Sequence, residues 1–252
     1  MSFAADRDRF HAGLAAAAGV DPAALARAGT TVAPRSDRAG SGAIAAYWAG
    51  AHAILWCDPA VATDLGPLAH DERTIGRQDL AESLAALGFE LFAEADQYLL
   101  RSTPTLPPLP DGYHHRRLRA EVAEHVELIR AFTGRNDPDD VEEAALDDLE
   151  DYSEVAIVVV VDDGPDGEHL VAYASAQVWD WDPGFGDIAV LVHPDHRGRG
   201  LAAWCAAACV HDLVAIGHVP LYRHESTNLG SAAVARRLGF EPVTSLAYHR
   251  RT

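Results

Sequence analysis

The segment VHPDHRGRGLA, residues 192–202, combines positive charge with backbone freedom in a way that could do chemistry. Two arginines, Arg197 and Arg199, alternate with Gly198 and Gly200 between an apolar run and an alanine-rich segment. Glycine accepts positive φ and leaves no Cβ in the way of a ligand, and a helix that starts after such a loop presents unpaired N–H groups at its positive end. The pattern predicts a site for a phosphate-like anion, although a surface turn with solvated arginines would contain the same residues.

A strand must lead into this loop and a helix must leave it. The apolar run at 185–192 predicts the strand, and the alanine-rich run at 201–217 predicts the helix. Upstream, EVAIVVVV at 154–161 is β-branched and apolar, as a central strand covered on both faces would be. Turn residues at 162–167 then return the chain as an antiparallel strand at 169–179.

The other segments beyond residue 112 alternate between strand and helix. Asp137 and Pro138 supply a cap and a first-turn proline for an acid-rich helix. The expected elements are strands at 114–118, 218–225 and 240–250 and helices at 120–132, 139–151 and 231–239. This order predicts an α/β protein of the α+β type, with a mixed, mostly antiparallel central sheet flanked by helices.

A proline-rich stretch, STPTLPPLPDG at 102–112, divides the chain. Prolines disfavour helix and favour an extended connector, so we expect an accessory lobe at 1–101 and a larger domain at 113–252. The smaller lobe is also expected to be α/β. Its predicted elements are strands at 42–50 and 52–59 and helices at 60–69 and 78–87.

The net charge limits the partners of the chain. It is −18, and no residue is a lysine. A field of this sign repels nucleic acid and attracts cations, unless the acidity is a property of the whole proteome. The N-terminal residues lack the apolar core of a signal peptide and no run reaches membrane-spanning length, so we expect a cytoplasmic protein without a membrane partner. The three cysteines are expected to be reduced, and the oligomeric state stays open, with a homodimer among the alternatives.

Arg197, Gly200 and Ala202 fit the pattern R-x-x-G-x-A, and Asn228 and ARRLGFEP at 235–242 follow in order. Over residues 113–252 this arrangement resembles the GNAT superfamily of N-acyltransferases. The resemblance implies acetyl-CoA as co-substrate, its pyrophosphate on the loop, its pantetheine arm along the preceding strand, and a splay between that strand and the strand at 218–224. The cofactor-binding residues that it implies are Val190, Leu191, Val192, Arg197, Gly198, Arg199, Gly200, Leu201, Ala202 and Asn228, of which Asn228 also suits a helix cap.

Two positions depart from the resembled family. Gly186 stands where many members carry a glutamate general base, and Ala235 where a tyrosine general acid is frequent. Holding the amine against the thioester carbonyl and binding the oxyanion would still support aminolysis. The candidate catalytic residues are Tyr222, His224, Glu225 and Ser231, each of which would also suit a surface or capping position, whereas alternation turns Asp187 to the other face of its strand.

The acceptor is expected to be a primary amine of a small, cationic molecule that attacks acetyl-CoA directly in a ternary complex. The residues expected to bind it are Trp179, Asp180, Trp181 and Asp182, because indoles and carboxylates suit a cationic amine, although ordinary hairpin packing would also explain them. Two alternatives are an acetyl-CoA-binding sensor without catalysis and a protein or peptide N-acetyltransferase. No metal is expected, because His193 and His196 lack a third ligand nearby.

The N-terminal lobe contains a segment that is similar in sequence to the C-terminal end of the chain. SLAALGFELFAEADQYLL at 83–100 resembles ARRLGFEPVTSLAYHR at 235–250, since in each a helix stops at Leu-Gly-Phe-Glu and a strand with a tyrosine follows. We expect the lobe to be a partial copy of the acyltransferase end, unless the match is a chance repeat of a common helix stop. No glycine-arginine loop precedes it, so no second cofactor site is expected.

Overall fold

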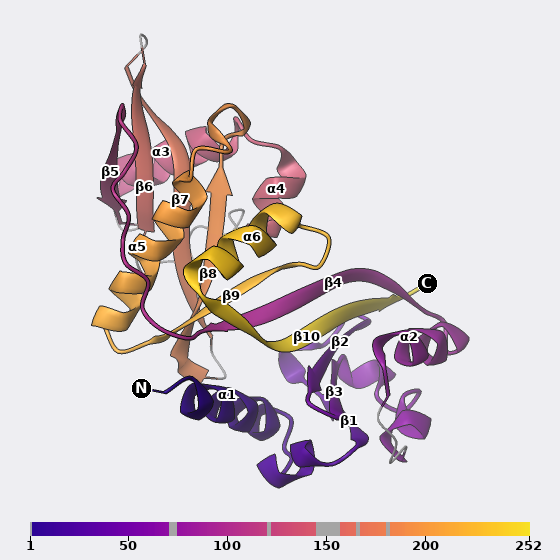
Figure 1. Ribbon diagram of the computed structural model, residues 1–252. Helices are drawn as coiled ribbons and strands as arrows, with labels where there is room; N and C mark the ends of the chain where they lie inside the picture. The colour runs from indigo at the N-terminus through magenta and orange to yellow at the C-terminus, as the bar shows by residue number, and fades with distance from the viewer. Residues whose placement is uncertain (1, 71–74, 120–121, 145–156, 165–166, 180–181) are drawn as a thin grey trace. The chain divides into compact units, whose positions relative to one another are not determined.

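The computed structural model describes residues 2–70, 75–119, 122–144, 157–164, 167–179 and 182–252 (Figure 1). The chain forms two compact units. The first unit consists of residues 1–98, 225–228 and 242–252, and the second of residues 99–224 and 229–241. The chain therefore returns to the first unit for one turn at 225–228 and again for its C-terminal strand.

The second unit contains the strands that flank the glycine-arginine loop. Their order is β9-β8-β7-β6-β5. Strands β5, β6, β7 and β8 pair antiparallel with their neighbours, whereas β8 and β9 run parallel because a helix crosses over between them. The bounds are β5 Tyr113–Leu118, β6 Ile157–Gly164, β7 Gly167–Trp179, β8 Asp182–Val192 and β9 Val219–Glu225.

Helices lie on both faces of this sheet. α3 (Ala123–Thr133) packs on one face, in a core that contains Phe132, Tyr173 and Leu191. The crossover helix α5 (Leu201–Ala215) packs on β6, β7 and β8 from the opposite face, as Figure 1 shows. The second unit also contains α4 (Pro138–Glu143) and α6 (Leu229–Leu238). Along β8, the side chains therefore alternate between the α3 face, which takes Leu191, and the α5 face, which takes residue 186.

The first unit has its own sheet and core. Its strand order is β1-β3-β2-β10-β4, in which β2 and β3 form a hairpin and β1 runs parallel to β3. Apolar residues of β2, β3, α2 and the segments between them pack together around Ile44, Leu55 and Leu80. The bounds are α1 Phe3–Ala17, β1 Gly29–Pro34, β2 Ala43–Ala49, β3 His52–Cys57, α2 Arg77–Ala86, β4 Phe89–Leu100 and β10 Phe240–Arg251.

The predicted fold class is confirmed, and some elements differ in detail. The segment at 60–69 is not an α-helix but two short 3₁₀ turns, Pro59–Val61 and Gly66–His70, the first capped by Asp58. The helix expected from residue 120 begins at Ala123, because Val122 is extended. Asp137 caps α4 as predicted, although α4 ends at Glu143 and the rest of the predicted 139–151 helix after Ala144 lies outside the described residues. Helix α1 and strand β1 were not predicted from the sequence.

The two Leu-Gly-Phe-Glu segments have the same local structure. Gly88 follows α2 and Gly239 follows α6, each with φ +82°, the left-handed conformation that ends a helix. Both glycines lead into long strands, β4 and β10, which are neighbours in one sheet. The duplication of the lobe remains a prediction, supported by this common helix, glycine and strand unit.

Candidate functional site

The parallel pair β8 and β9 opens at its C-terminal end. Backbone pairing runs from Phe185 and Val219 to Ile188 and Tyr222, and the described register ends there. On its other side, β8 remains paired with β7 as far as Val192. Residues 189–192 therefore present one backbone edge to a splay between the strands, at the place where the family resemblance implies a pantetheine arm. Figure 1 shows the two strands diverging.

The loop that follows β8 has the predicted backbone geometry. Gly198 has φ +76° and Gly200 has φ +82°, both in the region that favours glycine. Gly200 is also the N-cap of α5 and supplies no side-chain cap, so the first N–H groups of the helix face outward without an intrahelical acceptor. A Cβ at either glycine would meet no protein atom within 4 Å, which leaves room for a ligand.

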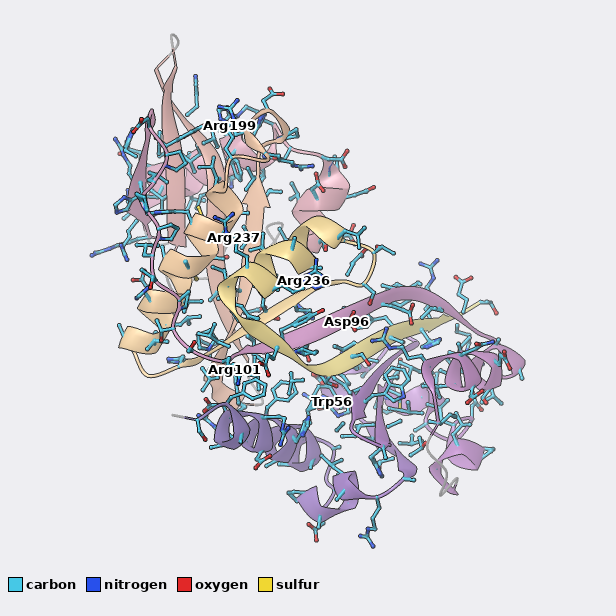
Figure 2. The ribbon with its side chains drawn as sticks, viewed as in Figure 1. Trp56, Asp96, Arg101, Arg199, Arg236 and Arg237 are labelled. Carbon is cyan, nitrogen blue, oxygen red and sulfur yellow. The ribbon has the colours of Figure 1, made fainter. Side chains whose placement is uncertain are left out.

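The two arginines of the loop have different partners. Arg197 Nε donates to Val192 O at 3.1 Å and its Nη2 to Asp140 Oδ2 at 2.6 Å, so this side chain fastens the loop to β8 and to α4. Arg199, labelled in Figure 2, donates from Nη1 to Tyr113 Oη at 2.6 Å and from Nη2 to the carbonyl of Asp195 at 3.1 Å, and it is exposed. Arg199 is therefore the better placed of the two arginines to meet an anion.

Two of the catalytic candidates are in contact. The Tyr222 hydroxyl lies 3.0 Å from Ser231 Oγ, and the Tyr222 ring meets the His224 ring edge to face at 6.4 Å. Burial raises the pKa of Tyr222 to about 12, so the phenol keeps its proton at neutral pH. Glu225 is exposed and lies in the first unit with Asn228, whose N–H donates to the Glu225 carbonyl at 2.9 Å.

The two positions where the resembled family carries its acid and base are closed. Ala235 is fully buried. At Gly186, a Cβ would collide with Leu213 of α5. Asp187 lies on the opposite face, as predicted, where its carboxylate is 7% exposed and lies 3.3 Å from Arg223 Nη2.

The expected acceptor residues are only partly described. Trp179 pairs with Asp182 at the end of the β7 and β8 register. Asp182 Oδ1 accepts from Gly184 N at 3.0 Å and so shapes the start of β8. Asp180 and Trp181 lie outside the described residues.

Several residues of this site were not predicted. Tyr113 links Arg199 to His196 Nδ1, which lies 3.0 Å from its hydroxyl, and Asp140 holds Arg197. Both come from segments distant in sequence, and neither belongs to a motif. The pair of Asp187 and Arg223 could have been found from the strand alternation together with the parallel register, because both side chains share one face of adjacent strands.

Two negative findings concern the described residues of the chain. These residues contain no group of three His, Cys, Asp or Glu side chains that could hold a metal ion. None of their helices is both long and apolar enough to cross a bilayer.

Comparison with solved structures identifies similar folds. A tandem GNAT protein from the clavulanic acid biosynthesis pathway has a TM-score of 0.54 and 18% identity, with 69% of this chain and 58% of that chain covered. A GCN5-related N-acetyltransferase from Kribbella flavida has a TM-score of 0.50 and 21% identity over 68% and 63% of the two chains. A GNAT-family acetyltransferase from Colwellia psychrerythraea has a TM-score of 0.50 and 13% identity over 79% and 76%. At these identities the likeness concerns the fold.

A family model matches part of the second unit by sequence. A search among curated proteins finds no match. Residues 123–240 match the model of the acetyltransferase (GNAT) family, and this region contains the splayed strands, the glycine-arginine loop and α5. The resemblance inferred from the R-x-x-G-x-A motif is thereby confirmed. Over residues 123–240 the chain is thus similar to the acetyltransferase (GNAT) family.

Proposed function

We propose that this protein transfers the acetyl group of acetyl-CoA to the primary amine of a small, cationic molecule, by direct attack in a ternary complex. The observation that carries the proposal is the end of the β8 and β9 register at Ile188 and Tyr222, immediately before a loop with two left-handed glycines. In the reaction the amine nitrogen bonds to the thioester carbonyl carbon, the C–S bond breaks, the nitrogen loses a proton and the sulfur gains one.

The hydrogen-bonding groups around the loop fit two parts of acetyl-CoA, its pyrophosphate and its pantetheine arm. Backbone N–H groups of residues 198–203 and the exposed Arg199 suit a pyrophosphate. The edge of residues 189–192 that β9 no longer pairs suits the amides of a pantetheine arm, which would extend the sheet by strand-like hydrogen bonds. On this stretch the Val192 carbonyl already accepts from Arg197 Nε. N–H groups on the same edge would stabilise the oxyanion of the tetrahedral intermediate.

The acceptor is expected on the α3 face of the sheet, because Leu213 and α5 close the other face at Gly186. Asp187 lies on that face beside the last paired residue of β8. We assign to Asp187 the proton that leaves the attacking ammonium, in place of a carboxylate at position 186. Arg223, whose Nη2 lies 3.3 Å from Asp187 Oδ2, would orient the carboxylate between turnovers.

The departing thiolate needs a proton donor, because its pKa lies near ~8.5. Tyr222 and Ser231 lie on the α5 and α6 side and share a hydrogen bond. Tyr222 is protonated at neutral pH because burial raises its pKa to about 12. We therefore assign the proton donation to this hydroxyl pair and a packing role to His224, whose ring contacts that of Tyr222.

The acceptor class is inferred from charge. A net charge of −18 attracts cations toward the protein, and Asp182 lies at the start of the strand that carries Asp187. Indoles at Trp179 and Trp181 would suit the apolar flank of an amine.

The test is a screen of small amines, polyamines, amino sugars and peptides for thiol release from acetyl-CoA. Release with a small cationic amine, together with the acetylated product by mass spectrometry, supports the proposal. Acetyl-CoA binding without thiol release from any acceptor would instead favour a sensor, the alternative suggested by Gly186 and Ala235. A preference for peptides or folded proteins would overturn the acceptor class.

A further inference from the structure

The turn that joins β9 to α6, residues 225–228, is held by residues of the N-terminal part of the chain. These residues belong to the first unit, although the elements on either side of them belong to the second. Ser226 N donates to the carbonyl of Glu94 at 2.9 Å, and Ser226 Oγ donates to Asp96 Oδ2 at 3.1 Å. β4 therefore holds the turn by one backbone and one side-chain hydrogen bond, both to the same serine.

Asp96 is itself fixed by Arg77 of α2. Arg77, the first residue of α2, donates from Nη2 to Asp96 Oδ1, and its Nη1 lies 3.8 Å from Glu94 Oε1. The guanidinium carbon of Arg77 lies 5.9 Å from the centre of the Trp48 ring, and Trp48 Nε1 donates to the carbonyl of Ile75 at 2.8 Å. The side chains of Arg77 and Asp96 are 33% and 29% exposed, so the pair is more shielded than a surface ion pair.

The turn lies next to residues that the proposed reaction uses. It follows His224 and ends at Asn228, the residue that the family pattern relates to the cofactor. Asn228 N donates to the Glu225 carbonyl, so a shift of Ser226 would reach Asn228 within the same hydrogen-bonded turn. Because β9 ends and α6 begins here, the position of the turn also limits where Tyr222 and Ser231 meet.

We propose that Asp96 is a positioning residue of the acetyltransferase. Asp96 is labelled in Figure 2. Held by Arg77 and bonded to Ser226, it fixes the turn between β9 and α6, and acetyl-CoA affinity therefore depends on a carboxylate in β4 that does not touch the reacting atoms. This gives the N-terminal lobe a function other than a second cofactor site, and it rests on the proposed function.

Four variants test the proposal. Ser226→Ala and Asp96→Ala remove the two ends of the side-chain link, and Ser226→Thr keeps a hydroxyl. Glu90→Gln is the control, because Glu90 lies on the same strand and pairs with Arg250 in an exposed ion pair. We would measure acetyl-CoA affinity by calorimetry, the KM for acetyl-CoA and kcat with the best amine, and amide hydrogen exchange of peptides that cover 222–231.

Ser226→Ala is expected to weaken acetyl-CoA binding about threefold to tenfold, the effect of one lost hydrogen bond, with faster exchange of the 222–231 peptides. Most of the effect should appear in KM. Ser226→Thr should restore parental affinity, and Glu90→Gln should match the parent. Asp96→Ala combined with Ser226→Ala should be no worse than Asp96→Ala alone, because the two residues act on the same link.

Parental affinity and parental exchange in Ser226→Ala would overturn the proposal, as would faster exchange without any loss of affinity. If Asp96→Ala does not fold, Ser226→Ala and Ser226→Thr decide the matter. A parent protein that binds no acetyl-CoA would overturn the proposed function instead, and the exchange of the 222–231 peptides would still report whether Asp96 and Ser226 order the turn.

Discussion

Leu213 of α5 fills the space that a side chain at position 186 of β8 would need. Its Cδ1 would lie 3.0 Å and its Cγ 3.3 Å from a Cβ at that position, and its Cδ2 closer still. Leu213 is fully buried, so it has little room to turn away. The absence of a carboxylate at the usual base position is therefore built into the packing between β8 and α5, which directs attention to Asp187 on the other face.

Replacing Gly186 by alanine is expected to destabilise the fold by about 1–3 kcal/mol through overpacking, in spite of the ~0.5–1 kcal/mol that loss of unfolded-state freedom would contribute. The measurement is urea unfolding. Leu213→Ala alone should cost about 2–5 kcal/mol as a cavity, and the double variant should cost clearly less than the sum of the two. Additive costs would show that the two positions do not compete for the same space.

The pyrophosphate assignment predicts an effect of a Cβ at Gly200. Gly200→Ala is expected to weaken acetyl-CoA binding about tenfold, because the Cβ would displace a phosphate contact at the start of α5. Gly217→Ala is the matched control, since Gly217 follows the other end of α5 with φ +86° and also has no protein atom near a Cβ. Both substitutions carry the same strain of a left-handed alanine. Equal affinities in the two variants would contradict the assignment of this loop.

The assignment of Tyr222 as proton donor to the departing thiolate predicts that its loss changes turnover and leaves the affinity for acetyl-CoA unchanged. Tyr222→Phe removes the hydroxyl that bonds to Ser231 and is expected to lower kcat about tenfold to hundredfold, with the acetyl-CoA KM unchanged. His224→Gln, which keeps the Tyr222 hydroxyl, should have the smaller effect. If Tyr222→Phe retains full kcat, the thiolate takes its proton from elsewhere.

The same tyrosine predicts a loss of stability in alkali. Its pKa is raised by burial to about 12, whereas an unfolded tyrosine titrates near ~10. Its contribution is therefore complete below pH ~10 and is lost as the pH rises toward ~12, because the unfolded chain loses this proton first. The measurement is the free energy of unfolding of the parent and of Tyr222→Phe across this pH range. It should fall more steeply with pH in the parent than in Tyr222→Phe. Parallel pH curves would show that Tyr222 titrates alike in both states.

Sequence reasoning located the glycine-arginine loop because its signal is local. Gly198 and Gly200 need positive φ, and the apolar runs on either side of them have the lengths of a strand and a helix. The end of the β8 and β9 pairing was inferred only through the family resemblance, since no residue in either strand indicates where two parallel strands separate. The hairpin of β2 and β3 was found from its apolar runs, whereas β1, with few apolar residues, was not.

Contacts between distant segments could not be predicted in the same way. Arg197 was expected to meet a phosphate, and its hydrogen bonds to Val192 and Asp140 depend on where α4 lies. The link from Arg77 through Asp96 to Ser226 joins three segments that share no motif and no periodicity. Each of these side chains alone resembles an ordinary exposed polar residue, so only their tertiary placement identifies the role.

A buried histidine in the first unit predicts acid sensitivity. His249 is 1% exposed, neither ring nitrogen has a hydrogen-bond partner among the described residues, and burial lowers its pKa. Because the folded pKa lies below the unfolded value near ~6.5, the stability is present above this pH and is lost as the pH falls toward the lowered folded pKa. His249→Leu should make the free energy of unfolding less dependent on pH between pH 7 and pH 5 than it is in the parent. The control is His115→Leu, which replaces an exposed histidine and should keep the parental pH dependence. An unchanged slope would show that His249 does not titrate on unfolding.

A cationic acceptor predicts that the kinetic constants for the acceptor respond to salt and to the charge of Asp182. If the field of the protein draws the amine to the site, the kcat/KM for the best acceptor should fall between low and high ionic strength, while the acetyl-CoA KM, set by close contacts at the loop, should change little. Asp182→Asn separates charge from structure, because an amide oxygen can still accept from Gly184 N and only the charge is lost. It should raise the acceptor KM about threefold, the effect of one partly exposed charge, whereas Asp182→Ala should also loosen the start of β8 and lower the melting temperature. An acceptor KM that is the same in Asp182→Asn and at both salt concentrations would leave the net charge of −18 without a role in acceptor choice.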